Sequence, residues 1–482
     1  MKRVCSFFFT IAVATCHAGT FRDDRGVTHE ISGKPTIVTF AHTAVTLSHF
    51  GLDRSQLVGV YGEFVHDGSD YDFENLQRGS TYPADPMPEE MEFITSVPHI
   101  SPSCLRGYCQ EFDLDIFRDV KPDYIVMHGY RGDLWGFDAD KEKQVVNIIG
   151  KPIIYIDVAQ QGANCISEKD HESCYGKSMI EVVEQYYELA KALGIDIPSS
   201  VEQDRLDLCN AAEIFQDAAE IAHTNGVRAI AGYISVNEFR NATSYLAYPP
   251  DDMVLRMFEE LGMPLIHPGI CQAEGCSQNY FWEWIPTNAL FPQCSPGQDP
   301  VTCDGEVLYP ADMWLYDHRT TLSFTSPDFR NSFPDPAVLR GQYEYWPIGG
   351  GIISFKHAAE ILSIMAPALA KMERIHDRTP CTAANVSSIE HAQDGLAAGS
   401  YACFDRAVHR ASYLQCPAKK KKVSNGAIIG ICGGVAVLLL GAALLYYRKK
   451  RSMKKESLEE GKLESSSEAT NNDSTTMPHG LS

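Results

Sequence analysis

Residues 112–158 alternate twice between an amphipathic stretch and a short apolar run. In each repeat a proline, Pro122 or Pro152, closes the amphipathic stretch, and an apolar run follows at residues 124–127 or 153–156. Proline disfavours a helix just before it, and a continuous apolar run is typical of a parallel strand that is buried on both faces. The pattern therefore predicts two successive helix–strand units of a parallel α/β sheet.

Further elements extend this α/β pattern over most of the chain. Apolar runs predict four more strands, at residues 36–40, 57–61, 228–234 and 313–316. Amphipathic periodicity predicts helices at residues 252–261 and 356–372. About 400 residues remain once a leader, a membrane segment and a tail are set aside, and a chain of that size divides into two lobes rather than one.

One long helix is predicted to join the two lobes. Ser199 and Glu202 have the spacing of a capping box after Pro198, and apolar residues recur at helical spacing until Asn225 and Gly226 end the run. A helix of roughly 24 residues is about 36 Å long, which is enough to bridge two globular lobes. An ordinary packing helix within one lobe is the alternative.

The two ends of the chain predict a leader and a membrane anchor. Lys2 and Arg3 precede an apolar run at residues 4–13 and a small-residue cleavage site before Gly19, which together are typical of a secretory signal. Residues 427–447 are uncharged, and as a helix they span about 31 Å, enough for the hydrocarbon core of a bilayer. We expect a single-pass protein whose body lies outside the cell or in a lumen.

The chain is therefore expected to divide into parts that follow one another in order. They are a signal peptide (1–18), a first α/β lobe (19–198), a linker helix (199–225), a second α/β lobe (226–380), a membrane-proximal segment (381–426), a transmembrane helix (427–447) and a disordered cytoplasmic tail (448–482). The second lobe contains an insertion at residues 271–310 that is rich in Pro, Gly, Cys and aromatic residues. We expect this insertion to form a disulfide-stapled loop over one face.

Cysteine usage predicts an oxidising compartment. The chain has 15 cysteines, and an even number remains after Cys5, Cys16 and Cys432 are set aside. Four pairs are close in sequence and predict local disulfides: Cys104 with Cys109, Cys165 with Cys174, Cys271 with Cys276, and Cys294 with Cys303. A zinc site is the alternative, and it is disfavoured because none of these pairs has the two-residue gap of a zinc knuckle.

The remaining cysteines and two sequons fit the same compartment. Cys381, Cys403 and Cys416 are expected to pin the membrane-proximal segment to the body, with Cys209 as one possible partner. Asn241 and Asn385 each begin a glycosylation sequon.

Charge and motifs narrow the classes of function. The formal net charge is −22, and the acidic excess lies in residues 19–418, which disfavours nucleic acid and anionic lipid as partners. The sequence contains no phosphate-binding glycine loop, nucleophile elbow, zinc-protease helix motif or dinucleotide fingerprint. We therefore expect a binding protein rather than an enzyme, with no covalent cofactor.

Five segments, taken in order, resemble bacterial periplasmic substrate-binding proteins of the iron-siderophore and cobalamin class. They are residues 36–64, 112–158, 229–239, 253–263 and 341–369. The resemblance implies an α/β fold of two Rossmann-like lobes joined by a single long backbone helix, the class III periplasmic-binding-protein fold, with one C-terminal transmembrane helix added. The Cys-rich insertion, the sequons and the anchor depart from the bacterial pattern and resemble membrane-anchored eukaryotic algal ferrichrome-binding-type receptors.

Residues after the predicted strands are the candidates for ligand contact, because ligands of open parallel sheets sit beyond the carboxyl ends of the strands. A bulky metal chelate needs flat aromatic faces and a few donors such as Arg or Tyr. The candidates in the first lobe are His42, Tyr61, Phe64, Tyr130, Arg131 and Trp135. Those in the second are Tyr233, Asn237, Tyr245, Trp314, Arg319 and Trp346. For each, a packed aromatic or a solvated charge is the alternative.

The resemblance also implies a function and its foremost residues. In relatives, the turn that matches MHGYRGD offers an aromatic ring or an arginine to the ligand, which favours Tyr130 and Arg131. The implied function is capture of a ferric siderophore of the hydroxamate type, at the cell surface or on an endosomal membrane. Endocytosis or reduction of the iron by a partner ferric reductase would then follow.

Two alternative functions stay open on the sequence alone. One is binding of another metal species, either cobalamin, haem, or a Zn or Mn ion held by His42, His66, His128 and His357. The other is an adhesion or signalling domain without a small ligand. An aromatic cleft that bears arginine favours the chelate, whereas a cluster of histidines and carboxylates favours the ion.

Overall fold

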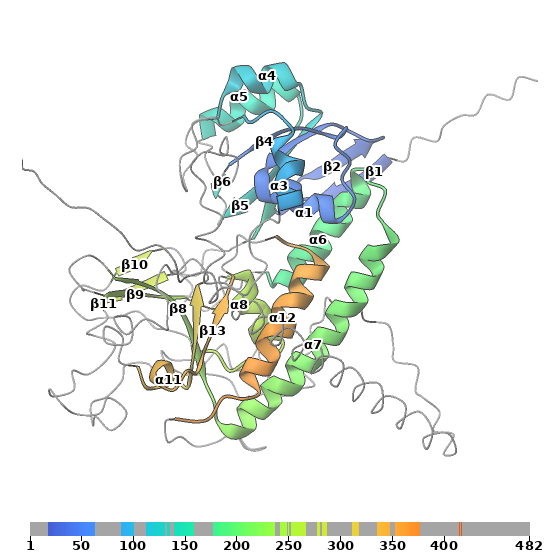
Figure 1. Cartoon of the computed structure of the whole chain (residues 1–482). Coiled ribbons are helices and arrows are strands. Elements are labelled where there is room, and N and C mark those ends of the chain that lie inside the picture. Colours follow the sequence, from blue (N-terminus) through green and yellow to red (C-terminus); the bar gives the residue numbers. More distant parts are fainter. Residues whose placement is uncertain are drawn as a thin grey trace, which may run out of the picture. The chain divides into compact units, whose positions relative to one another are not determined.

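The computed structural model describes residues 18–62, 88–100, 112–130, 133–134, 139–158, 177–236, 242–247, 249, 252–266, 277–279, 282–286, 311–317, 335–347, 352–375, 414 and 416 (Figure 1). These residues belong to one unit of the chain, Met1–Cys416. The predicted signal peptide up to residue 17, the four local cysteine pairs, the asparagines of both sequons, residues 427–447 and the tail lie outside them. Within the described ranges, no helix is both long enough and apolar enough to cross a membrane.

The first sheet is built from the apolar runs that precede the long helix. Its parallel strands are β3 (Ile37–Phe40), β4 (Leu57–Tyr61), β5 (Tyr124–Tyr130) and β7 (Ile154–Asp157). β5 pairs with both β3 and β7, and the short β6 (Asp133–Leu134) pairs antiparallel with the end of β5. The predicted strands are confirmed, and β5 continues three residues beyond its predicted end because its last residues pair with β7 and β6.

Both predicted helix–strand units are present. α4 (Leu114–Val120) begins at Asp113, whose carboxylate accepts hydrogen bonds from the backbone N–H groups of Asp115 and Ile116. It ends at Lys121, which takes a left-handed conformation (φ 48°), and β5 follows. The second unit is α5 (Ala139–Ile149) followed by β7. The other helices of this lobe are α1 (Ala41–His49), α3 (Pro88–Thr95) and α6 (Met179–Ala192).

A short N-terminal hairpin was not predicted from the sequence. It consists of β1 (Ala18–Arg22) and β2 (Thr28–Ser32), which pair antiparallel. A fully buried hydrogen bond of 2.9 Å joins Asp23 to His29. Asp23 also accepts a hydrogen bond from the backbone N–H of Tyr155, so the hairpin is fastened to β7.

The predicted long helix is present, but the prediction of a capping box at its first turn is wrong. α7 spans Ser199–Asn225 and ends at Gly226, which takes a left-handed conformation (φ 71°). Pro198 occupies the N-cap position, so Ser199 already lies inside the helix and caps nothing. The Glu202 carboxylate instead accepts a hydrogen bond of 2.6 Å from the hydroxyl of Tyr187. A capping box does form one helix earlier, between Ser178 and Glu181 of α6.

The second sheet follows the long helix and has the order β10-β11-β9-β8-β12-β13. β8 (Ala229–Val236), β12 (Met313–Asp317) and β13 (Tyr343–Trp346) are parallel, whereas β9 (Ala242–Ala247), β10 (Ser277–Asn279) and β11 (Trp282–Pro286) are antiparallel. β10 and β11 lie within residues 271–310, so part of the predicted loop insertion is instead a pair of edge strands. Backbone pairing with β9 explains this difference. The helices here are α8 (Met253–Glu260), α11 (Pro336–Leu339) and α12 (Phe355–Leu369).

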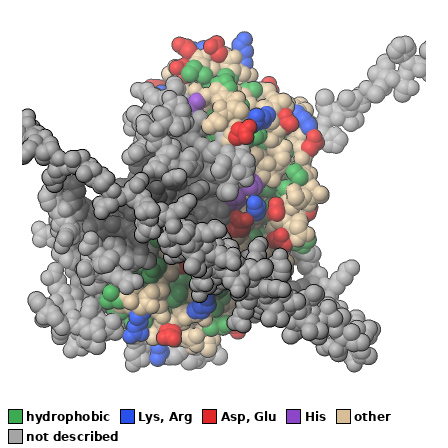
Figure 2. Space-filling view, viewed as in Figure 1, with side chains coloured by type: hydrophobic (Ala, Val, Ile, Leu, Met, Phe, Trp, Pro, Cys, Tyr) green, Lys and Arg blue, Asp and Glu red, His purple; other side chains and the backbone are tan. Residues whose placement is uncertain are grey.

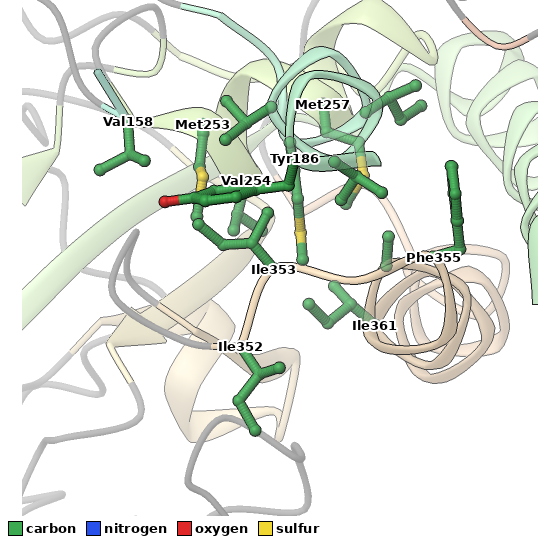
Figure 3. Close-up of a cluster of buried hydrophobic side chains, with 14 of the residues drawn as sticks. Val158, Tyr186, Met253, Val254, Met257, Ile352, Ile353, Phe355 and Ile361 are labelled. Atoms are coloured by element: carbon green, nitrogen blue, oxygen red, sulfur yellow. The ribbon is translucent and has the colours of Figure 1, made fainter. Parts of the chain in front are cut away.

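One buried apolar cluster connects the two sheets. Helix α12 packs along α7 (Figure 1). The cluster also joins Val158 and Tyr186 of the first lobe to Met253 and Ile353 of the second (Figure 3). Buried residues of both lobes therefore belong to one apolar core.

A disulfide ties the end of the described chain to the long helix. Cys209 of α7 is bonded to Cys416, with a Cα–Cα distance of 5.7 Å and a sequence separation of 207. Leu414 is buried in the main apolar cluster two residues before. The expectation that Cys209 pairs with one of the membrane-proximal cysteines is confirmed.

Candidate functional site

The carboxyl ends of the first sheet gather several of the predicted residues. Because β3, β4, β5 and β7 are parallel, their last residues lie along one edge of the sheet. Tyr61 ends β4, His128 lies near the end of β5, and Asp157 ends β7. Helix α1 follows β3 without a loop, which places His42 at the same edge. These four residues therefore come from the same edge of the first sheet.

An aromatic cluster fills this edge. The ring of Phe40 lies 5.6 Å from the ring of Tyr61, 5.5 Å from that of His42 and 5.5 Å from that of His128, on which it stacks. Tyr61 contacts Phe112 in turn, at 5.9 Å. None of the five side chains is more than 7% exposed. We call these five residues the aromatic floor, since they form a rigid base beneath the strand ends.

His128 and the tyrosine hydroxyls at the aromatic floor are neutral at neutral pH. Burial lowers the pKa of His128 to about 4, so its imidazole is neutral. Its Nδ1 lies 3.5 Å from the hydroxyl of Tyr186, which in turn shares a hydrogen bond of 3.4 Å with the hydroxyl of Thr43. Burial also raises the pKa values of Tyr61 and Tyr186 above the usual range of tyrosine. The base of the site is therefore aromatic, and its His128 and tyrosine side chains are neutral.

Gly129 fixes the end of β5. A β-carbon at this position would lie 1.9 Å from the ring of Tyr155, a distance that no side chain can tolerate. The register pairs Gly129 with Asp157, and the backbone N–H of Val158 donates to the Gly129 carbonyl at 3.1 Å. This close packing determines where the backbone of Tyr130 leaves the sheet.

The second sheet presents its carboxyl ends in a similar way. Trp314 and Tyr316 of β12 stack at 5.7 Å, and both are buried. Trp346, the last residue of β13, is fully buried in the main apolar cluster. Tyr245 of β9 is half-buried and lies opposite Tyr233 of β8 in the register. Tyr316 and Trp346 therefore lie at the carboxyl ends of β12 and β13, whereas Trp314 lies near the amino end of β12.

The structure separates the predicted contact residues into three groups. His42, Tyr61, Trp314 and Trp346 are at most 7% exposed, so direct contact with a ligand would require these side chains to move. Tyr130, Tyr233 and Tyr245 lie in strands that reach the site. Phe64, Arg131, Trp135, Asn237 and Arg319 lie outside the described residues. Ligand contact stays a prediction for all of them.

The histidines proposed for a bare metal ion do not all meet. His42 and His128 share the aromatic floor, but His357 lies in α12 and contacts His49, with ring centroids 4.9 Å apart. His66 lies outside the described residues. Among the residues that are described, no group of three or more His, Cys, Asp or Glu side chains is arranged to hold a metal ion.

Sequence reasoning missed Phe40 and Phe112 of the aromatic floor, and it missed three residues that lie against the floor. Tyr186 reaches the floor from α6, Thr43 from the first turn of α1, and Tyr155 from the middle of β7. Tyr186 belongs to an amphipathic stretch with a capping box, so its helix could have been found from the sequence. Its contact with His128 depends on how the helix packs on the sheet, which no local pattern indicates.

Charge is mixed on the described surface around these elements. On the face shown in Figure 2, acidic and basic side chains alternate over the described part rather than gathering by sign. The described surface in this view therefore indicates no strongly basic binding face.

Comparison with solved structures identifies the fold. The ferric-siderophore receptor protein DesE from Streptomyces coelicolor matches with a TM-score of 0.50 and 19% identity, over 74% of this chain and 99% of that chain. The siderophore periplasmic binding protein from the fuscachelin gene cluster of Thermobifida fusca matches with a TM-score of 0.41 and 13% identity. The match covers 70% of this chain and 98% of that chain. Streptococcus pneumoniae PiaA, solved in complex with ferrichrome, matches with a TM-score of 0.39 and 13% identity, over 73% of this chain and 99% of that chain.

No family model matches the chain, and no curated protein matches it in sequence. The match to DesE nevertheless spans nearly the whole of that receptor. The chain therefore has the class III periplasmic-binding-protein fold that the resemblance of its segments implied.

Proposed function

We propose that this protein binds a ferric siderophore of the hydroxamate type at the carboxyl ends of its two sheets. The observation that carries the proposal is the fold, which is similar to that of a ferric-siderophore receptor along almost its entire length. Strand ends lined by aromatic residues fit the same ligand class, because the organic shell of such a chelate offers flat apolar faces.

The charge of the site supports this class of ligand. His128 of the aromatic floor is neutral at neutral pH, and the whole chain carries a formal net charge of −22. A neutral or cationic complex, such as a ferric hydroxamate, approaches this protein without electrostatic repulsion. A strongly anionic chelate is disfavoured.

Tyr130 and Arg131 are the contacts we assign first. Tyr130 ends β5, directly after the position that Gly129 and Tyr155 fix, and Arg131 is the next residue. An arginine donates charge-assisted hydrogen bonds to the carbonyl and hydroxamate oxygens around the metal. In the second lobe, Tyr233 and Tyr245 are the matching aromatic candidates because they face each other in the register.

Capture at a membrane completes the proposal. The predicted signal peptide and the apolar run at residues 427–447 would hold the binding unit at the cell surface or in an endosomal membrane. A tethered binding protein does not diffuse to a permease with its cargo. We therefore propose that uptake proceeds by endocytosis or by local reduction of the ferric ion by a partner enzyme.

Titration of the purified full-length chain tests the binding step. Quenching of tryptophan fluorescence by ferrichrome would be compared for the wild type, Arg131→Ala and Arg118→Ala. A charge-assisted hydrogen bond in a partly enclosed site contributes about 1.5 to 3 kcal/mol, so Arg131→Ala should weaken affinity roughly ten- to a hundredfold. Arg118 forms an exposed ion pair with Asp115 on α4 and is the matched control, with affinity unchanged.

The same titration separates the alternatives. Zinc, manganese, cobalamin and haem would be added in parallel with ferrichrome. A wild type that binds one of these and ignores ferrichrome overturns the chelate assignment. Equal ferrichrome affinity of the wild type and Arg131→Ala overturns the site assignment and leaves the ligand assignment intact.

A further inference from the structure

The turn of the N-terminal hairpin pairs with the edge of the first sheet at β7. Among the described strands, β7 pairs with β5 alone, and an edge strand leaves one row of backbone groups without a neighbouring strand. The backbone N–H of Asp24 donates to the carbonyl of Tyr155 at 3.1 Å, and the Asp23 carboxylate accepts from the backbone N–H of Tyr155 at 3.3 Å. The Asp24 carboxylate accepts from the backbone N–H of Asp157 at 2.6 Å. The two aspartates therefore take the place of a further strand.

The two aspartates have different roles. The side chain of Asp23 is fully buried, and besides Tyr155 it bonds His29 and the backbone N–H groups of Arg25 and Val27 within the hairpin. It therefore holds the hairpin itself together. The Asp24 carboxylate bonds groups that lie outside the hairpin, on β7 and on α6. Asp24 is thus the side chain that links the hairpin to two other elements.

Helix α6 holds the Asp24 carboxylate in place. Lys177, just before the N-cap of α6, and Gln185, within the helix, both donate to Oδ1 of Asp24, the latter at 3.0 Å. The Lys177 ammonium also donates to the side-chain oxygen of Gln185 at 2.7 Å. The Lys177 and Asp24 side chains are 26% and 16% exposed, so the ion pair is largely enclosed. Because α6 occupies one carboxylate oxygen, the other is oriented toward Asp157 and makes a charge-assisted hydrogen bond.

The end of β7 in turn sets the end of β5. The register pairs Asp157 with Gly129, and the backbone N–H of Val158 donates to the Gly129 carbonyl at 3.1 Å. Gly129 directly precedes Tyr130, the last residue of β5. Hydrogen bonds therefore connect Asp24 to the backbone that leads into Tyr130, and a displaced end of β7 would move that backbone.

We propose that Asp24 is a positioning residue of the ligand site, which fixes the end of β7 and through it the point where the backbone of Tyr130 leaves β5. The contact of Tyr130 with the ligand rests on the proposed function. A contact residue whose backbone is already held in place loses less freedom when the ligand binds, so a preformed strand end raises affinity. Asp24 itself touches no ligand and acts through the hydrogen bonds of Asp157 and Val158.

Hydrogen exchange without ligand tests the positioning step. Exchange of the Val158 amide in the full-length chain would be compared between the wild type and Asp24→Ala. This amide bonds Gly129 rather than Asp24, so its protection reports on the end of β7 and should fall at least about fivefold in the variant. The Ile37 amide, which bonds the Gln56 carbonyl at the amino end of β3, is the control for unfolding of the lobe and should stay within about twofold. Faster exchange of the Asp157 amide alone overturns the proposal.

Affinity for ferrichrome provides the second readout. Titration followed by tryptophan fluorescence should show about a tenfold loss of affinity in Asp24→Ala. Asp24→Asn keeps an acceptor for the Asp157 amide and should stay within about threefold of the wild type. Asp196→Ala is the matched control, because it removes a carboxylate that pairs with Lys34 beyond the far end of α6, and its affinity should be unchanged.

The outcomes separate the positioning role from the proposed function. Equal ferrichrome affinity of the wild type and Asp24→Ala overturns the positioning role and leaves the ligand assignment intact. An equal loss in Asp24→Asn and Asp24→Ala overturns the hydrogen bond to Asp157 as its basis. If the wild type does not bind ferrichrome, the proposed function fails, while exchange of the Val158 amide still decides whether Asp24 fixes β7.

A second variant covers the case in which Asp24→Ala does not fold. The double variant Lys177→Met, Gln185→Ala leaves the Asp24 carboxylate in the chain and removes the two donors that orient it. Protection of the Val158 amide should fall in this variant as well, and unchanged protection overturns the proposal.

Discussion

Replacement of Asp335 by asparagine should stabilise the protein relative to the wild type, and this difference in the free energy of unfolding should grow as the pH rises. Asp335 is fully buried at the N-cap of α11, where one carboxylate oxygen accepts hydrogen bonds from the backbone N–H groups of Ala337 (2.7 Å) and Val338 (3.3 Å). Burial raises its pKa to about 7, against the opposing hydrogen bonds from Trp314 and from these two amides. Asparagine keeps an acceptor for the amides and removes the buried charge.

The sign of the effect follows from proton binding. An aspartate in an unfolded chain has a pKa of about 3.9, so between about pH 4 and about pH 7 the folded protein holds a proton that the unfolded chain has lost. The contribution of Asp335 to the free energy of unfolding of the wild type is therefore largest below about pH 4. It declines as the pH rises to about 7. The decline is about 1.4 kcal/mol per pH unit and reaches at most about 4 kcal/mol.

Urea unfolding of the wild type and Asp335→Asn at several pH values measures this difference. Fluorescence of Trp314 and Trp346, both buried at the second sheet, reports on the lobe that contains Asp335. The free-energy advantage of Asp335→Asn should grow from about pH 5 to about pH 7 and then level off. Asp113→Asn makes the same change at the half-buried N-cap of α4 and is the control. A difference between wild type and Asp335→Asn that is constant with pH, or that shrinks, refutes the reasoning.

Two further substitutions test the packing of the fold. Gly129→Ala should lower the free energy of unfolding by about 1 to 3 kcal/mol, because its β-carbon would overlap the ring of Tyr155, and Gly129→Ala with Tyr155→Ala should recover part of this loss in the same urea assay. Cys209→Ser should lower it by about 2 to 5 kcal/mol. A peptide map without reductant should show Cys209 linked to Cys416, and finding both as free thiols in the wild type would contradict the assignment.

The strands that could be predicted from the sequence are those buried on both faces. Residues 124–127 and 153–156 are continuous apolar runs, and both belong to parallel strands of the first sheet, β5 and β7, which pair with each other. The long helix was predictable for a similar reason, since its apolar stripe is unbroken up to Gly226. Edge elements gave weaker signals. The strands β10 and β11 are short and form because β11 pairs with β9 and β10 pairs with β11, which a local pattern does not indicate.

Two serines show that a local sequence motif alone does not determine which hydrogen bonds form. Ser178 and Ser199 each precede a glutamate by three residues, and the first pair alone forms a capping box. The second fails because Pro198 starts the helix one residue earlier and because Glu202 bonds Tyr187 of another helix. The same limit applies to the site. Its residues at strand ends could be named from the sequence, whereas the contact of Tyr186 with His128 depends on tertiary packing.

The bond between Cys209 and Cys416 closes a covalent ring around the second sheet and α12. A protease that cuts the chain once anywhere between these two cysteines leaves both fragments joined. Such a nicked molecule keeps its full mass until a reductant opens the ring. The second lobe can therefore survive a cut in a surface loop without being released.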